Sequence, residues 1–215
     1  PENTLPAFAA AIEAGADWLE LDVRMTADSR LAVIHDETVT RTTGARGRVE
    51  TMTFAALSRL DAGAWFDDRF AGTGVPSLED VMEIARGGVG LLVEVKEPRD
   101  RGQEIWDVLA GTLNGFDGEY IIQSFDAEFV RMVKRAAPRT RAALLTKSTR
   151  ALAVAADIGA DAVNVGIRSA AAGRVPAIKA AGLGCFVWTV KSARSLRAAL
   201  EYDVDGVITN YPREI

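Results

Sequence analysis

The sequence predicts an α/β fold, a (β/α)8 barrel whose first strand is missing from the chain as given. Short runs of β-branched and apolar residues alternate with alanine-rich stretches of helical periodicity, which is typical of parallel strands joined by crossover helices. No glycine-rich dinucleotide fingerprint follows any of these runs, which disfavours an open doubly wound sheet. Seven runs count as parallel strands, one fewer than a closed barrel needs. They begin at Trp18, Leu91, Tyr120, Arg141, Ala162, Gly184 and Val207.

The N-terminal elements follow from local signals. Asn3 can cap a helix whose apolar residues recur at helical spacing from Leu5 to Ile12, and Gly15 is placed to end it. The first strand then covers residues 18–23. Residues 31–35 form an additional strand, joined to the first by a short turn, and are predicted to be a hairpin extension.

The rest of the chain continues the alternation, with helices predicted at residues 127–137 and 192–202. Residues 36–74 do not fit it, because they are rich in Arg, Thr, Gly and Asp, and we interpret them as an excursion over the barrel mouth. The remaining strands are predicted at residues 91–96, 120–125, 141–145, 162–165, 184–190 and 207–210.

Composition limits the class of protein. A chain of 215 residues can bury one substantial core, so residues 1–215 are predicted to form a single domain. The longest apolar runs are too short to span a bilayer. A formal net charge of −5 gives no basic face for nucleic acid, so a small anionic substrate would need a local cation. Oligomeric state is not readable from the sequence.

Neither the single cysteine nor the N-terminal residue indicates a catalytic or binding role. Cys185 excludes an intramolecular disulfide in this chain, and its apolar surroundings predict a buried strand residue without a chemical role. The chain begins at Pro1, with no initiator Met and no signal-like segment, which indicates that residues upstream are absent from this record. A cytoplasmic location is the expectation.

Carboxylates interrupt two of the predicted buried strands. Because strand side chains alternate between faces, Glu20 and Asp22 should point the same way, into the barrel, together with Glu94 from the second strand. Ionised acids are costly to bury unpaired, and a hard divalent cation is the usual remedy. With few His or Cys ligands available, this oxygen-rich set suits Mg²⁺ or Ca²⁺ rather than zinc. The alternative is a buried salt-bridge network, in which Lys96 would be one partner.

His35 is the only histidine and lies at the end of the hairpin strand, directly before Asp36. Its unperturbed pKa suits proton transfer near neutrality, and its position could bring it over the carboxylates. A surface or core histidine without a chemical role is an equal alternative from the residues alone.

At this point the residues resemble a known family, the glycerophosphodiester phosphodiesterases, over essentially the whole chain. Any one of the shared motifs would be weak, whereas so many in order make chance similarity very improbable. The motifs are Pro1-Glu2-Asn3-Thr4, Gly15-Ala16-Asp17, Glu20-Leu21-Asp22-Val23, Val33-Ile34-His35-Asp36, Arg41-Thr42-Thr43, Val75-Pro76-Ser77-Leu78, Glu94-Val95-Lys96, Gln123-Ser124-Phe125, Val187-Trp188-Thr189-Val190 and the run from Val204-Asp205-Gly206 to Tyr211-Pro212.

The resemblance implies a (β/α)8 barrel that hydrolyses glycerophosphodiesters to glycerol 3-phosphate and an alcohol with Ca²⁺ or Mg²⁺. It implies that the 36–74 excursion walls the glycerol side of the pocket, and that a cyclic phosphate forms by attack of the glycerol 2-hydroxyl, although direct attack by water stays open. The implied roles are metal ligation by Glu20, Asp22 and Glu94, proton transfer by His35, phosphate contact by Lys96 and lining of the mouth by Trp188.

One family motif is absent. The family carries His-Arg-Gly on its first barrel strand, shortly before the Pro-Glu-Asn-Thr segment, and this chain starts at Pro1. Taken literally, the chain could bind metal but would hydrolyse very poorly. For Asn3 we expect a capping role. For Glu2 two roles stay open, orienting the missing arginine from outside the site or favouring the helix N-terminus electrostatically.

Two other functions remain in competition. A sphingomyelinase D-like or phospholipase D-like barrel would use the same acids and histidine on choline lipids, and it would need an apolar rim; Trp65, Phe66 and Phe70 are the nearest candidates, with packing inside the excursion as the alternative. A catalytically inactive barrel that binds phosphodiesters or a protein partner is the other.

Overall fold

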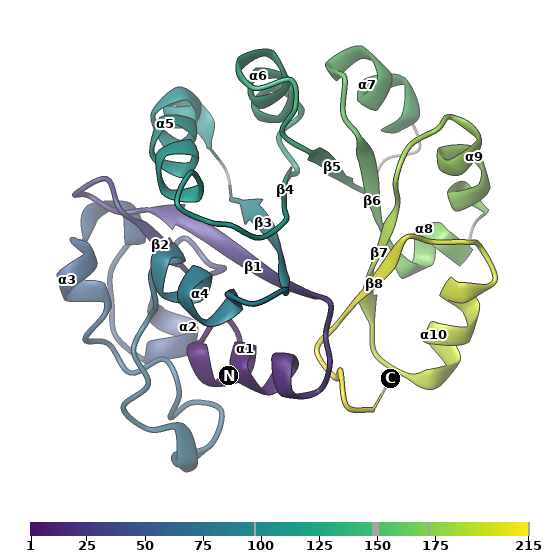
Figure 1. The fold of residues 1–215 in the computed structure, drawn as a ribbon. Coiled ribbons are helices and arrows are strands. Elements are labelled where there is room, and N and C mark those ends of the chain that lie inside the picture. Colours follow the sequence, from purple (N-terminus) through teal and green to yellow (C-terminus); the bar gives the residue numbers. More distant parts are fainter. Residues whose placement is uncertain (97, 148–150, 172, 215) are drawn as a thin grey trace. The chain divides into compact units, whose positions relative to one another are not determined.

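The computed structural model describes residues 1–96, 98–147, 151–171 and 173–214. Its contacts divide the chain into two compact units, Pro1–Tyr120 and Ile121–Ile215 (Figure 1). Both are α/β, as predicted. The single domain stays a prediction.

The first unit is built on three strands in the order β2-β1-β3. β1 (Trp18–Met25) pairs antiparallel with β2 (Leu31–Val33), which confirms the hairpin, and parallel with β3 (Gly90–Val95). Its helices and 3-10 turns are α1 (Leu5–Glu13), α2 (Thr40–Thr43), η1 (Val49–Thr51), α3 (Phe54–Leu57), η2 (Asp68–Phe70), α4 (Leu78–Ala85), η3 (Arg99–Arg101) and α5 (Gly102–Leu113).

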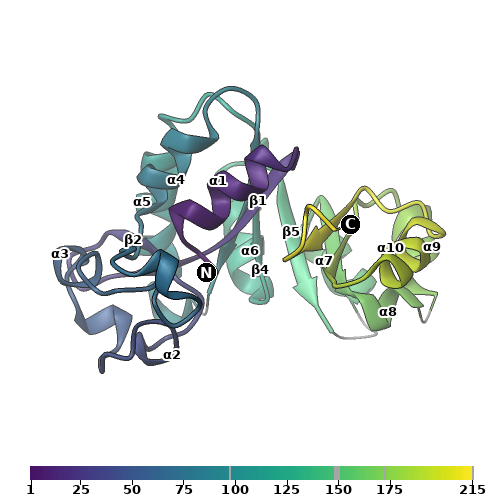
Figure 2. The same ribbon diagram turned by 90° about the horizontal axis from the view of Figure 1, so that it is seen from below.

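The excursion packs beside β2 on a small core of its own (Figures 1 and 2). Apolar side chains from β2 and from the short helices meet there and exclude water, which gives this irregular segment a fixed shape. The fully buried members include Ala32, Val39 and Leu57.

The second unit continues with parallel strands in the order β4-β5-β6-β7-β8. Every predicted strand is present, with bounds that differ from the expected ones by one or two residues. Figure 1 shows α6, α7, α9 and α10 outside these strands. The elements are β4 (Tyr120–Ser124), α6 (Ala127–Ala136), β5 (Ala142–Thr146), α7 (Ala151–Ile158), β6 (Ala162–Gly166), α8 (Ile167–Ala171), α9 (Arg174–Ala180), β7 (Phe186–Val190), α10 (Ala193–Leu200) and β8 (Gly206–Thr209).

The start of α1 corrects one prediction. Thr4, not Asn3, occupies the N-cap position, and its buried hydroxyl donates to the carbonyl oxygen of Pro1 at 2.7 Å instead of capping the helix. Asn3 has a positive φ of 53°, a left-handed conformation that Asn adopts more readily than most residues. Its side chain is thereby free to turn away from the helix.

Candidate functional site

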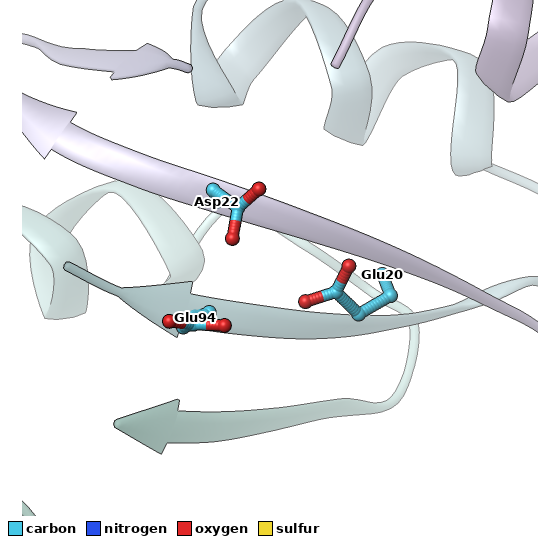
Figure 3. A group of neighbouring side chains, drawn as sticks. All are labelled: Glu20, Asp22 and Glu94. Carbon is cyan, nitrogen blue, oxygen red and sulfur yellow. The ribbon is translucent and has the colours of Figure 1, made fainter. Parts of the chain in front are cut away.

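Three carboxylates converge on the first unit (Figure 3). Glu20 and Asp22 lie on the same face of β1, and the parallel register places Glu94 of β3 opposite Asp22. One oxygen from each side chain lies within 4.8 Å of the others. Asp22 and Glu94 are each only 6 % exposed. Strand alternation therefore brings together the three acids that the sequence singled out, as expected from the two-residue period.

Lys96 directly follows β3 and inserts its ammonium group between two of these acids. Its Nζ lies 2.9 Å from Asp22 Oδ1 and 2.5 Å from Glu94 Oε1. The second contact is an ion pair at a buried oxygen, and Glu94 Oε1 has no partner besides this ammonium group among the described residues. The salt-bridge arrangement considered from the sequence is thus present, with one ammonium group shared between two carboxylates.

Burial and the neighbouring charges shift the pKa values of two groups in the cluster, Glu94 and Lys96. Burial raises the pKa of the Glu94 carboxyl, and the negative charge of Asp22 raises it further, against the opposing effects of Lys96 and His35. For Lys96, burial lowers the pKa, but attraction by Asp22 and Glu94 outweighs that effect and the net pKa is raised. Lys96 is therefore held protonated beside these carboxyl groups.

Asn3 is a partner of the site that the sequence analysis misassigned. Its Nδ2 donates to Asp22 Oδ2 at 2.7 Å, and its Oδ1 accepts from the backbone N–H of Asp22 at 3.1 Å. These two contacts fix the orientation of the Asp22 carboxylate and leave Oδ1 directed to Lys96. No local signal separates this role from helix capping, because both Asn3 and Thr4 are good capping residues.

The β1–β2 hairpin places the backbone of His35 beside the C-terminal half of β1. The N–H of the preceding residue, Ile34, donates to the carbonyl oxygen of Asp22 at 2.9 Å, and Arg24 Nε donates to the carbonyl oxygen of His35 at 2.9 Å. The imidazole is half exposed, and its Nδ1 lies 2.7 Å from Asp36 Oδ1. His35 is therefore accessible for proton exchange and oriented by a carboxylate on one side.

Arg41 joins Glu2 to the histidine side of the site. Its Nε donates to Asp36 Oδ2 at 2.6 Å, while its two terminal nitrogens donate to the Glu2 carboxylate at 2.9 and 2.6 Å. In this structure Glu2 pairs with Arg41, and the two roles expected for Glu2 stay predictions. The hydrogen bond that Arg41 donates lowers the pKa of Asp36 to about 2, despite partial burial that acts the other way.

A cavity of about 210 Å³ adjoins Lys96 within the first unit. Its lining includes the apolar residues Met25 and Ile105, the basic residues Arg24 and Arg101, and several acidic residues. Arg24 lies two residues beyond Asp22 on β1, so the two side chains leave the strand on the same face.

The remaining predicted site residue, Trp188, lies on β7 in the second unit. Its ring packs edge-on against Phe125, with ring centroids 5.7 Å apart, and Lys147 Nζ lies 5.9 Å from the Trp188 ring. The indole Nε1 is buried and has no hydrogen-bond partner among the described residues. A substrate contact for Trp188 stays a prediction. Cys185, just before β7, is fully buried as predicted.

With this geometry in hand, comparison with known proteins identifies the family. Residues 1–214 match the model of the glycerophosphoryl diester phosphodiesterase family. The chain belongs to this family. It is 35 % identical to a glycerophosphodiester phosphodiesterase of Caldanaerobacter subterraneus subsp. tengcongensis, over all of this chain and 90 % of that protein. It is 32 % identical to one of Bacillus subtilis, over 99 % of this chain and 80 % of that protein.

Solved structures of the family share the fold. A glycerophosphodiester phosphodiesterase from Agrobacterium tumefaciens matches with a TM-score of 0.80 and 32 % identity, covering 99 % of this chain and 92 % of that one. A phosphodiesterase from Oleispira antarctica, solved in complex with the product sn-glycerol-3-phosphate, matches with a TM-score of 0.93 and 24 % identity over 99 % of this chain and 89 % of that one. These comparisons confirm the predicted (β/α)8-barrel fold class and the resemblance.

The residues present fit a divalent cation. Carboxylate oxygens are the donors that Ca²⁺ and Mg²⁺ prefer, and Glu20, Asp22 and Glu94 supply one each within coordinating reach of one another. Glu94 Oε1 is buried and has only the Lys96 ammonium group beside it among the described residues, so it keeps a lone pair for a cation. Oxygen donors alone do not discriminate between the two metals.

Proposed function

We propose that this chain hydrolyses glycerophosphodiesters to glycerol 3-phosphate and an alcohol, with Ca²⁺ or Mg²⁺ bound at the carboxylate cluster and His35 transferring a proton. The observation that carries the proposal is the convergence of Glu20, Asp22 and Glu94 beside Lys96. Membership of the family, and relatives at 35 % and 32 % identity that are named as glycerophosphodiester phosphodiesterases, support the substrate class.

A bound divalent cation would be held by the three carboxylates and would polarise a phosphoryl oxygen. Lys96 supplies a fixed positive charge at the same place, because its neighbours keep it protonated, and it would balance charge that develops on the phosphate. Both effects act on negative charge that grows in the transition state. The cluster is thus suited to phosphodiester cleavage rather than to cation storage alone.

His35 is the proposed proton-transfer residue of the described site. Its imidazole is exposed, is held by Asp36 through Nδ1, and leaves Nε2 available to exchange a proton with an attacking hydroxyl or a leaving oxygen. The family resemblance expects a second histidine in a His-Arg-Gly segment before Pro1. Attack by the glycerol 2-hydroxyl and attack by water both remain compatible with this arrangement.

The test is release of glycerol 3-phosphate from glycerophosphocholine, measured with EDTA and after adding back Ca²⁺ or Mg²⁺. It should be run on this chain and on a chain extended by the expected His-Arg-Gly segment. His35→Ala should lower kcat by about 100-fold or more, as for a lost general acid or base. Glu94→Gln should abolish the metal-dependent activity, and Glu83→Gln is its matched control, since Glu83 is an exposed acid on α4. Full activity in EDTA would refute the metal-dependent mechanism.

One observation favours a second candidate, hydrolysis of a lipid-held phosphodiester. Trp65 and Phe66 are 44 % and 58 % exposed, and their rings stack edge-on with centroids 5.8 Å apart. Packing inside the excursion does not bury them, and exposed aromatic residues can anchor a protein at a lipid surface. Adding lysophosphatidylcholine micelles as a substrate, with Trp65→Ser as the variant, would separate this candidate from hydrolysis of the water-soluble diester.

A further inference from the structure

Four side chains form a continuous line of charged contacts beside the carboxylate cluster. In order they are Glu2, Arg41, Asp36 and His35, and every link is at or below 2.9 Å. The charges alternate along the line from Glu2 to Asp36, so each contact reinforces the next. Only its last member, His35, has a role in the proposed function.

The backbone around Arg41 is well packed. Arg41 lies on α2, in which Thr42 is buried, and the preceding residue Val39 is buried as well. Gly44 ends the helix in a left-handed conformation. The guanidinium uses all three of its nitrogens, two on Glu2 and one on Asp36. A planar donor held at both ends by carboxylates has little rotational freedom.

We propose that Arg41 is a positioning residue for the reaction: clamped by Glu2, it holds Asp36 against Nδ1 of His35 and so keeps the imidazole proton on Nδ1, with Nε2 free to accept the substrate proton. The inference rests on the proposed function of His35. It adds a residue whose side-chain hydrogen bonds go to Glu2 and Asp36 and to none of the three clustered carboxylates.

The chemistry of Asp36 supports this direction of effect. The hydrogen bond from Arg41 is the main cause of its lowered pKa, so Asp36 is ionised and can only accept. A neutral imidazole facing such an acceptor must donate from Nδ1. In the proton transfer Nε2 takes the proton, the Nδ1–H bond stays intact, and the resulting imidazolium faces the Asp36 charge.

Exposure argues against a mainly structural role. The side chains of Glu2, Asp36 and Arg41 are 38 %, 31 % and 45 % exposed, and ion pairs at such positions add little to the stability of the fold. Loss of Arg41 should therefore leave the melting temperature almost unchanged. Its effect should be seen instead in the tautomer of His35.

The test compares Arg41→Gln with wild type by long-range ¹H–¹⁵N NMR of the imidazole. Because this sequence contains one histidine, the resonances of a tag-free chain belong to His35 alone, and kcat is measured on the chain extended by the expected His-Arg-Gly segment. Spectra should be recorded over a pH series, and the tautomer should be taken from the alkaline plateau at which the ring resonances no longer change. Arg69→Gln is the matched control, because Arg69 also makes two side-chain hydrogen bonds to one carboxylate, that of Asp67, in the same excursion.

Wild type should show the proton on Nδ1, whereas Arg41→Gln should show a mixture of the two tautomers. The kcat of Arg41→Gln should be lower by about tenfold with KM little changed, as expected when a functional histidine loses an outer partner. Arg41→Lys should restore part of the rate, because lysine keeps the positive charge but cannot donate to Glu2 and Asp36 from a planar guanidinium. Arg69→Gln should match wild type in both readouts.

An Nε2–H tautomer in wild type, or an identical tautomer population in Arg41→Gln, would overturn the positioning role. Failure of the proposed function looks different. If His35→Ala kept full activity while the tautomer still depended on Arg41, the catalytic use of His35 would be lost and the positioning role would be overturned with it.

Discussion

Replacement of Asn3 tests whether the orientation of Asp22 matters for metal binding. Asn3→Gly removes both hydrogen bonds to Asp22 while tolerating the positive φ of 53°. The charge-assisted bond contributes about 1.5 kcal/mol, the lower end of the usual range because Asn3 is only half buried, and the longer neutral bond adds about 0.5 kcal/mol. The free energy of unfolding should fall by about 2 kcal/mol, or about 4–8 °C in Tm.

Metal affinity should fall at the same time. Outer partners of a ligand contribute about 10-fold to 100-fold in affinity, and Asn3 holds the carboxylate from the side opposite Lys96. Titration calorimetry with Ca²⁺ and with Mg²⁺ measures this directly, without reference to turnover. Asn3→Ala should lose the same affinity but unfold more easily than Asn3→Gly, because a Cβ in the left-handed region costs about 1 kcal/mol.

The matched control is Asn114→Gly, which makes the same change at an exposed residue at the end of α5. It should lower stability by less than about 1 kcal/mol through chain entropy and leave metal affinity unchanged. If Asn3→Gly bound metal as tightly as wild type, the contacts to Asp22 would have no part in shaping the site, and the reasoning from geometry would be wrong.

Three further predictions concern the charged and thiol groups. Glu94→Gln should abolish metal binding in calorimetry yet leave metal-free stability equal or higher, since burial and Asp22 raise the Glu94 pKa; unchanged affinity would exclude Glu94 as a ligand. Lys96→Met should destabilise the metal-free protein by about 3 kcal/mol, because it leaves buried carboxylates without their cation, and Ca²⁺ should raise its Tm more than that of wild type. Burial raises the Cys185 pKa from 9.0 to about 12, so stability is unaffected below about pH 9 and falls between pH 9 and 12; alkylation at pH 8 should require unfolding, and rapid labelling of the native protein would contradict this.

The sequence predicted the part of the site that depends on strand alternation. Glu20 and Asp22 had to share a face of β1, and the short run through Glu94 and Lys96 had to lie parallel to it. Strand positions were also correct to within a residue or two, because each strand is a short apolar run between clear breaks. Periodicity is local information, and these features need nothing else.

The contacts around Asn3, Glu2 and Arg41 could not be predicted in the same way. Capping chemistry describes Asn3 and Thr4 equally well, and only the folded chain decides which of them begins the helix. Glu2 and Arg41 are 39 residues apart, and Arg41 lies in the one segment without periodicity. Its partners are fixed by the packing of the excursion on β2, which composition does not encode residue by residue.

The two readings of the carboxylate cluster, a salt bridge and a metal site, describe one arrangement rather than two. Glu20, Asp22 and Glu94 carry three negative charges when ionised and Lys96 one positive charge, so three minus one leaves an excess of two, which a single divalent cation balances. Lys96 contacts both Oδ1 of Asp22 and Oε1 of Glu94, while Asn3 holds Oδ2 of Asp22. One ammonium group is thus shared between two buried carboxylates, and Glu94 Oε1 has no other partner among the described residues. The lysine therefore limits the electrostatic cost of burying these acids together, and the charge that it does not balance is available to a cation.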